Sequence, residues 1–226
     1  MNDVLEKAEG KLFFKVNDDD YLIPEALELI DKWEYSIADR YKNYAGVSGL
    51  RVYQDGRIIG REWRYLSDYI DTTGLERRRY SLLGDKAEAY YTNIPRKYGP
   101  LPEFKEESLT FESMLYDKIA YEDLKIRWFG KSIYFTKYLE DGQTRTTRNR
   151  LKDNLNTYCV LLDSNLHYKS QPLKYMLKNL CLYSEICWSK NMDYSDTCGN
   201  FQYGKFLVYI CIFTKTIKLK GGMEYE

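Results

Sequence analysis

Three arginines fall within six positions of the stretch GQTRTTRNRLKDN, residues 142–154, with threonines and an asparagine among them. Guanidinium, hydroxyl and amide groups are donors that contact phosphate oxygens, and a helix start would add backbone N–H groups. The sequence therefore predicts an anion-binding surface around Arg145, Arg148 and Arg150. A patch that meets an acidic protein, or a loop exposed only to solvent, would have the same composition, so these alternatives stay open.

Basic side chains extend to the N-terminal side of this stretch. Residues 125–152 contain eight Lys and Arg against two acids, whereas residues 1–34 contain ten acids against four bases. The net charge of the chain is zero, so no general attraction to nucleic acid or to an anionic membrane is implied. The predicted binding residues here are Arg127, Lys131, Lys137, Arg145, Arg148 and Arg150, with Trp128 and Tyr134 available to stack on unpaired bases.

A second basic run consists of Arg77, Arg78 and Arg79. It follows residues that are predicted to end a helix, where cations are electrostatically favoured. Such a helix end accounts for one or two of the three arginines, and we include all three among the candidate binding residues.

Signatures of catalysis, metal binding and cofactor binding are absent from the sequence. His167 is the only histidine, the five cysteines form no CxxC pair, and neither GxxxxGK[ST] nor GxGxxG occurs. Carboxylates such as Asp18, Asp19 and Asp20 are numerous, but spacing in sequence neither fixes their separation nor shifts their pKa values. We expect no cofactor and no metal ion, and the sequence favours a binding protein over an enzyme.

The elements that must position these residues alternate between helical and strand patterns in no regular order. Steps of three and four residues between apolar side chains predict helices, and runs of β-branched and aromatic residues predict strands and hairpins. The expected helices are 24–44, 61–70, 111–122, 148–162 and 172–188, and the expected strands or hairpins are 11–16, 50–60, 126–139 and 205–219. The predicted fold class is α+β, with mixed helices and short antiparallel strands or hairpins in one compact unit or two small subdomains.

Three of the five prolines fall within eight residues, in TNIPRKYGPLP, residues 92–102. We therefore predict irregular structure from 84 to 102. The predicted organisation is an N-terminal α+β region at 1–94 and a linker or loop at 95–102. A C-terminal α+β region at 103–226 would then carry the basic hairpin and helix.

The 23 tyrosines, the separated charges and the missing catalytic motifs together favour an interaction protein. The leading hypothesis is a non-enzymatic intracellular protein that docks on a protein or a ribonucleoprotein complex. A phage or mobile-element inhibitor of a nucleic-acid-guided defence system, an anti-CRISPR-like protein, would fit this description. The alternative is direct binding of DNA or RNA, or a carboxylate-based nuclease, using residues 125–152.

The longest strongly apolar run, residues 206–213, is far shorter than the roughly 20 residues that span a bilayer. The acidic N-terminal residues also lack the chemistry of a signal peptide. We therefore expect a cytoplasmic location and no membrane partner.

Overall fold

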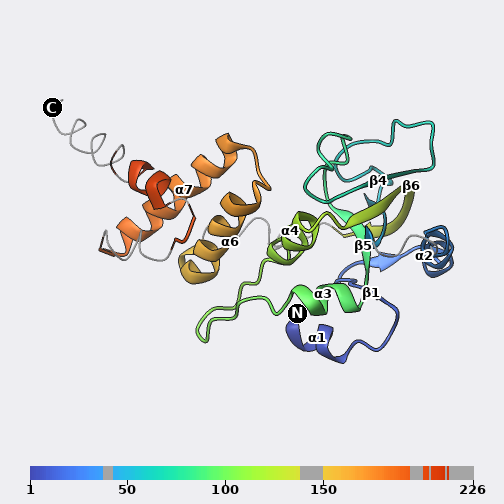
Figure 1. Cartoon of the computed structure of the whole chain (residues 1–226), viewed down its shortest axis with the longest axis horizontal. Helices are drawn as coiled ribbons and strands as arrows, with labels where there is room; N and C mark the ends of the chain where they lie inside the picture. The colour runs from blue at the N-terminus through green and yellow to red at the C-terminus, as the bar shows by residue number, and fades with distance from the viewer. Residues whose placement is uncertain (38–42, 138–149, 194–200, 204, 212, 214–226) are drawn as a thin grey trace. The chain divides into compact units, whose positions relative to one another are not determined.

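The computed structural model describes residues 1–37, 43–137, 150–193, 201–203, 205–211 and 213. The chain folds into two compact units, the sheet unit (Met1–Leu101 and Leu115–Gly142) and the helical unit (Pro102–Met114 and Gln143–Glu226). The predicted α+β class is confirmed, because helices accompany a mixed sheet (Figure 1). The division of the chain into domains at 95–102 stays a prediction.

The sheet is centred on its last strand in sequence, β6. The strand order is β1, β5, β3, β6, β2, and β4 pairs with β6 beside that path. Among these pairs β3 and β6 run parallel, and the other strands pair antiparallel. The strands are β1 Leu12–Phe14, β2 Tyr21–Leu22, β3 Tyr44–Tyr53, β4 Tyr69–Thr72, β5 Lys86–Tyr91 and β6 Lys125–Thr136.

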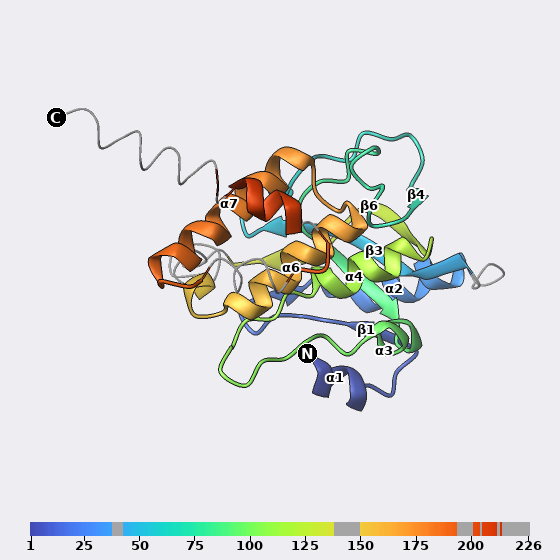
Figure 2. The ribbon, with the colours of Figure 1, turned by 60° about the vertical axis from the view of Figure 1, so that its left-hand side comes forward.

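Helices cover both faces of the sheet, because successive side chains of a strand point to opposite faces. Ala89 of β5 is buried in one core cluster with Trp33 of α2, whereas Tyr90, the next residue, stacks on Tyr116 of α4 with ring centroids 4.7 Å apart. At the edge of the unit, α1 and α3 lie beside each other (Figures 1 and 2). The helices around the sheet are α1 Asn2–Lys7, α2 Ala26–Tyr35, α3 Asn93–Tyr98 and α4 Ser113–Tyr121.

The described part of the helical unit contains α6 Leu155–Tyr168, α7 Leu173–Ser189 and a helical segment at 205–211. The helices α6 and α7 lie side by side, with the rings of Tyr158 and Tyr183 in edge contact at 5.9 Å (Figure 2). Leu180 and Val208, both 0% exposed, share one apolar core.

The strand predicted at 205–219 is wrong for its described part, which is helical. The segment buries Val208 and Cys211 in the core and exposes Phe206, as a helix packed on one side does. A short apolar run suits a strand and a buried helix equally well, so its packing partners decide between them.

The hairpin predicted at 126–139 is wrong, because 125–136 form the single strand β6. The other differences lie mainly before residue 102. The helix predicted at 24–44 ends at Tyr35, and β3 already begins at Tyr44. The helix predicted at 61–70 does not form: 61–68 is irregular, β4 follows it, and Leu66, expected on the apolar face, is fully exposed. The stretch 84–102, expected to be irregular, contains β5 and α3.

The first turn of α6 is capped by a carboxylate from the preceding part of the helical unit. Glu107 accepts hydrogen bonds from the backbone N–H groups of Asn156 and Thr157, both at 2.8 Å. Burial alone would raise the pKa of Glu107, but the hydrogen bonds from Thr157 and Asn156 outweigh it and hold the pKa below its ordinary value of 4.5. A negative charge also interacts favourably with the dipole at a helix N-terminus.

We predict that Glu107→Gln lowers the free energy of unfolding at neutral pH by about 1 kcal/mol, a typical cost of losing a helix cap. Because the folded-state pKa lies below the unfolded value, this stabilisation is present above 4.5 and is lost as the pH falls through the folded pKa. Denaturant titrations at neutral and acidic pH measure both effects, with exposed Glu106→Gln as the control. Equal stabilities of wild type and Glu107→Gln at neutral pH would contradict the assignment.

Candidate functional site

The structure describes only part of the predicted basic site. Arg145 and Arg148 lie outside the described residues, and Arg150 is half-buried in a helical turn that precedes α6. Lys137 is exposed beyond the end of β6, and its backbone N–H donates to Asp20 at 3.1 Å. Anion binding by the arginines stays a prediction.

Three further predicted site residues are buried inside the sheet unit. The exposed fractions of Arg127, Trp128 and Tyr134 are 3%, 1% and 0%. The indole N–H of Trp128 donates to the Thr72 carbonyl at 2.9 Å, and the guanidinium of Arg51 covers the Tyr134 ring at 4.1 Å. Neither ring offers a face on which an unpaired base could stack, which corrects that expectation.

The second basic run lies in a series of turns at 75–81, where a helix end was expected. Arg77 is 3.9 Å from the carboxylate of Glu88, and Arg79 is 2.6 Å from that of Glu76. Arg78 is exposed. Arg77 and Arg79 therefore pair with acids of their own unit.

A cavity of about 650 Å³ opens in the sheet unit where β6 bulges. Ser48 of β3 pairs with Trp128, but Leu50 pairs with Ser132, so β6 advances four residues where β3 advances two. Such bulges re-aim side chains and are frequent beside functional sites. The cavity is lined by Phe129, Gly130 and Lys131 of the bulge, by Leu29, Lys32, Trp33, Tyr35 and Ser36 of α2 and the residue after it, and by Trp63, Asp68 and Tyr69.

Aromatic rings form the walls of this cavity, which we call the aromatic pocket. Trp33 and Phe129 are stacked with centroids 4.4 Å apart and planes 7° apart, and Tyr69 is tilted against Phe129 at 5.6 Å. The Trp63 indole donates to the Ser67 carbonyl at 3.0 Å and lies directly against Gly130. A Cβ at Gly130 would be 2.4 Å from the indole, so only glycine permits this approach.

Arg127 holds two parts of the pocket lining from inside the protein. Its guanidinium makes a bidentate ion pair with Asp71, with both N–H···O distances at 2.8 Å. It also donates to the carbonyl and hydroxyl oxygens of Ser36 at 2.9 and 3.0 Å and lies 4.0 Å from the centre of the Tyr69 ring. Burial by itself lowers the pKa of Arg127, but Asp71 and Tyr44 outweigh it and raise the pKa above its ordinary value.

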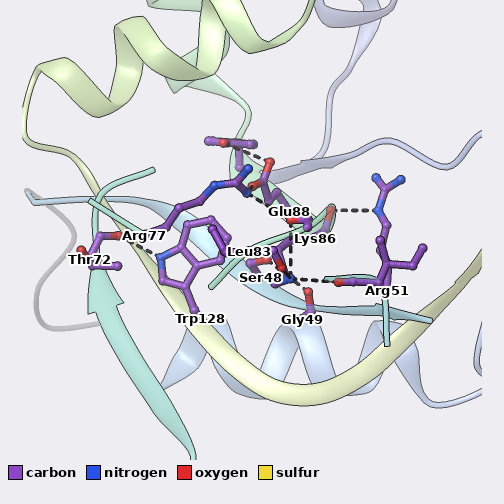
Figure 3. A network of polar contacts seen from close by, with 12 residues as sticks. Ser48, Gly49, Arg51, Thr72, Arg77, Leu83, Lys86, Glu88 and Trp128 are labelled. Carbon is purple, nitrogen blue, oxygen red and sulfur yellow. Dashed lines mark hydrogen bonds and ion pairs between the residues drawn. The ribbon is translucent and has the colours of Figure 1, made fainter. Parts of the chain in front are cut away.

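A second polar cluster lies on the α4 side of β5 and includes Arg77, Lys86 and Glu88 (Figure 3). The Lys86 ammonium donates to the Leu83 carbonyl at 2.5 Å, and burial lowers the pKa of Lys86 to about 8. Burial likewise raises the pKa of Glu88, which accepts a hydrogen bond from Tyr90 at 3.4 Å. Because these groups find their partners within the sheet unit, we interpret the cluster as structural.

Metal and membrane chemistry find no support in the described residues. In those ranges no group of three or more His, Cys, Asp or Glu side chains is arranged to hold a metal ion. Nor does any helix among them have the length and apolar character required to cross a bilayer.

Two aromatic residues of the pocket were not expected at a binding site. Trp33 was expected in a helix at 24–44, and Trp63 in a helix at 61–70 that does not form. The abundance of aromatic side chains was the available signal, but it does not show which rings meet. Lys131, a predicted binding residue, does line the pocket.

Comparison with known proteins gives structural matches and no sequence match. No protein-family model and no curated protein sequence matches the chain. A structure of S. aureus TarS residues 1–349 with UDP-GlcNAc is 14% identical, at a TM-score of 0.48, covering 100% of this chain and 72% of that one. The complex of the same TarS fragment with UDP is 13% identical, at a TM-score of 0.45, covering 100% and 71%. A structure of S. aureus TarS is 15% identical, at a TM-score of 0.41, covering 92% and 41%.

These matches overturn the functional hypothesis drawn from the sequence. The structures matched are of TarS, two of them in complexes with UDP-GlcNAc and UDP, and they contradict the expectation of a non-enzymatic, anti-CRISPR-like inhibitor. At this level of similarity the matches assign no activity to the chain, and its function has to be argued from its own residues.

We predict that Asp71→Asn lowers the free energy of unfolding by about 3 kcal/mol, because it leaves the buried Arg127 guanidinium without its counter-charge. The double variant Asp71→Leu with Arg127→Met should be more stable than Asp71→Asn, since it removes both charges. Denaturant titration followed by circular dichroism measures both values.

The matched control is Asp55→Asn, which breaks the exposed 2.6 Å ion pair with Arg57. It should cost much less than Asp71→Asn, because the pair is exposed to solvent. A loss in Asp71→Asn no larger than in this control would show that the buried pair does not organise the unit.

Proposed function

We propose that the sheet unit binds a phosphate-bearing sugar ligand, of the nucleotide-sugar class, in the aromatic pocket. The observation that carries the proposal is a cavity of about 650 Å³ that combines aromatic walls with two exposed lysines, Lys32 and Lys131. Ligand sites are typically cavities of roughly 300–1,000 Å³ with apolar walls and a few polar groups that fix orientation.

The walls suit a flat or ring-shaped group. Trp63 is half-buried and Tyr69 is 40% exposed, so both rings retain accessible surface beside the buried stack of Trp33 and Phe129. Aromatic faces stack on nucleobases and pack against apolar faces of other rings. A base or a sugar ring therefore has a complementary surface here.

The polar lining suits an anion with hydroxyl groups. Lys32 and Lys131 reach the cavity from α2 and from the β6 bulge, and among the described residues no ion pair engages either ammonium group. Ammonium groups bind phosphate as point charges. The exposed Asp68 and Ser36 add hydrogen-bonding groups that suit sugar hydroxyls.

Isothermal titration calorimetry of the full chain with UDP-GlcNAc, UDP and free GlcNAc tests the proposal. The two nucleotides are the first probes because they are the ligands in the TarS complexes. We expect UDP-GlcNAc to bind, and Lys131→Gln to weaken its binding about tenfold, which corresponds to the loss of one charge-assisted contact. Exposed Lys105→Gln in the helical unit is the matched control and should leave Kd unchanged.

Gly130→Ala tests the aromatic wall separately from the charge. Its methyl group would displace the Trp63 indole, so UDP-GlcNAc should bind more weakly although no lysine has changed. The proposal fails if none of the three compounds binds. It fails equally if UDP-GlcNAc binds with the same Kd in wild type, Lys131→Gln and Gly130→Ala.

A further inference from the structure

Two cysteine sulfurs of the helical unit lie within reach of one another. Cys181 on α7 and Cys211 at the end of the helical segment 205–211 are thirty residues apart in sequence, and their Sγ atoms are 3.2 Å apart. Neither cysteine forms a disulfide in this structure. A disulfide requires about 2.05 Å between the sulfurs, so they would have to approach by about 1.2 Å.

The packing around the two cysteines holds the sulfurs together before any reaction. The preceding residue in α7, Leu180, is 0% exposed, and so is Val208, one helical turn before Cys211. Both side chains belong to the core that also contains Cys211 and packs against Cys181. Because folding has already fixed the two helical segments, forming the bond loses little additional conformational entropy.

The two thiols differ in access, which gives them different roles in an oxidation. Cys181 is half-buried, whereas Cys211 is 4% exposed, so an oxidant in solution meets Cys181 first. Burial and the neighbouring Cys181 thiol raise the pKa of Cys211 to about 12, which keeps it protonated at neutral pH. Cys159 and Cys187, each 1% exposed, are closed to direct attack.

We propose that Cys181 and Cys211 are a thiol pair that low-molecular-weight disulfides, such as glutathione disulfide, oxidise to an intramolecular disulfide. The Cys181 thiolate attacks one sulfur of glutathione disulfide, forms a mixed disulfide and releases one glutathione thiolate. The Cys211 thiol then loses its proton and attacks the Cys181 sulfur, which releases the second glutathione. The protein gives up two protons and two electrons, and the oxidant is reduced to two glutathione molecules.

The bond would connect α7 covalently to the segment 205–211. It closes a loop between residues 181 and 211 and so restricts the unfolded chain, which raises the thermal midpoint of the helical unit. This inference is independent of the proposed ligand site, because both cysteines and their packing partners belong to the helical unit.

Peptide mapping of the full-length chain tests the proposal directly. The protein is incubated with glutathione disulfide, its remaining thiols are alkylated, and the digest is analysed by mass spectrometry without reductant. We expect a peptide pair joined through Cys181 and Cys211, two hydrogen atoms lighter than the separate peptides, which dithiothreitol splits. Thiols that all remain reduced or only glutathionylated, or a bond from Cys181 to Cys198, would overturn the proposal.

Single variants provide an independent readout in thermal denaturation. Oxidation should raise Tm in wild type and in Cys198→Ser, the matched control, but not in Cys181→Ser or Cys211→Ser. If the buried Cys211→Ser variant does not fold, the mapping of the unchanged chain and the half-buried Cys181→Ser variant still decide the question. An equal rise of Tm in Cys181→Ser would refute the assignment.

Discussion

A buried guanidinium joins four segments of the sheet unit at one point. Arg127 belongs to β6, and its partners are Asp71 of β4, Tyr44 at the start of β3, and Ser36 after the end of α2. A charge inside a protein is tolerated when it is paired and hydrogen-bonded, so the folded state requires all of these partners in place. Ser36 supplies a carbonyl from the helix C-terminus, where a cation is favoured. Arg127 therefore adds to the β4–β6 ladder and to the apolar packing of α2 in fixing both elements against β6.

The contacts of Arg127 also hold the walls of the aromatic pocket in place. Its walls come from α2, from the residues around the start of β4, and from the bulge of β6, which are the segments that Arg127 ties together. Trp63 is fixed in addition by its hydrogen bond to Ser67 and by the close approach that Gly130 permits. A pocket whose walls are held by buried contacts is ordered before a ligand arrives, which lowers the entropic cost of binding. This property favours a ligand site over an incidental hollow.

Elements whose own apolar residues recur at regular spacing could be predicted from the sequence. The positions of residues that depend on contacts with distant parts of the chain could not. The helix α7 was placed within a residue at each end, because its buried residues recur at helical spacing along seventeen residues. Arg127 was expected on a basic surface, since nothing local reveals that Asp71, 56 residues earlier, would neutralise it in the core. Trp63 was likewise assigned to the wrong element, because its position depends on the β6 bulge. Charge patterns thus located basic residues but not the carboxylates that pair with them.

The central position of β6 has a consequence for the order in which the chain acquires structure. The strands β2 and β4 pair with β6, and β3 pairs with it along most of its length, yet β6 starts only at Lys125. During synthesis, β1, β3 and β5 can associate as they emerge, whereas β2 and β4 have no pairing partner until β6 has been synthesised. Pairing between strands so far apart in sequence is slow, because a long loop must close first. Until then one edge of β3 is an open template for another chain, which makes the nascent sheet vulnerable to aggregation.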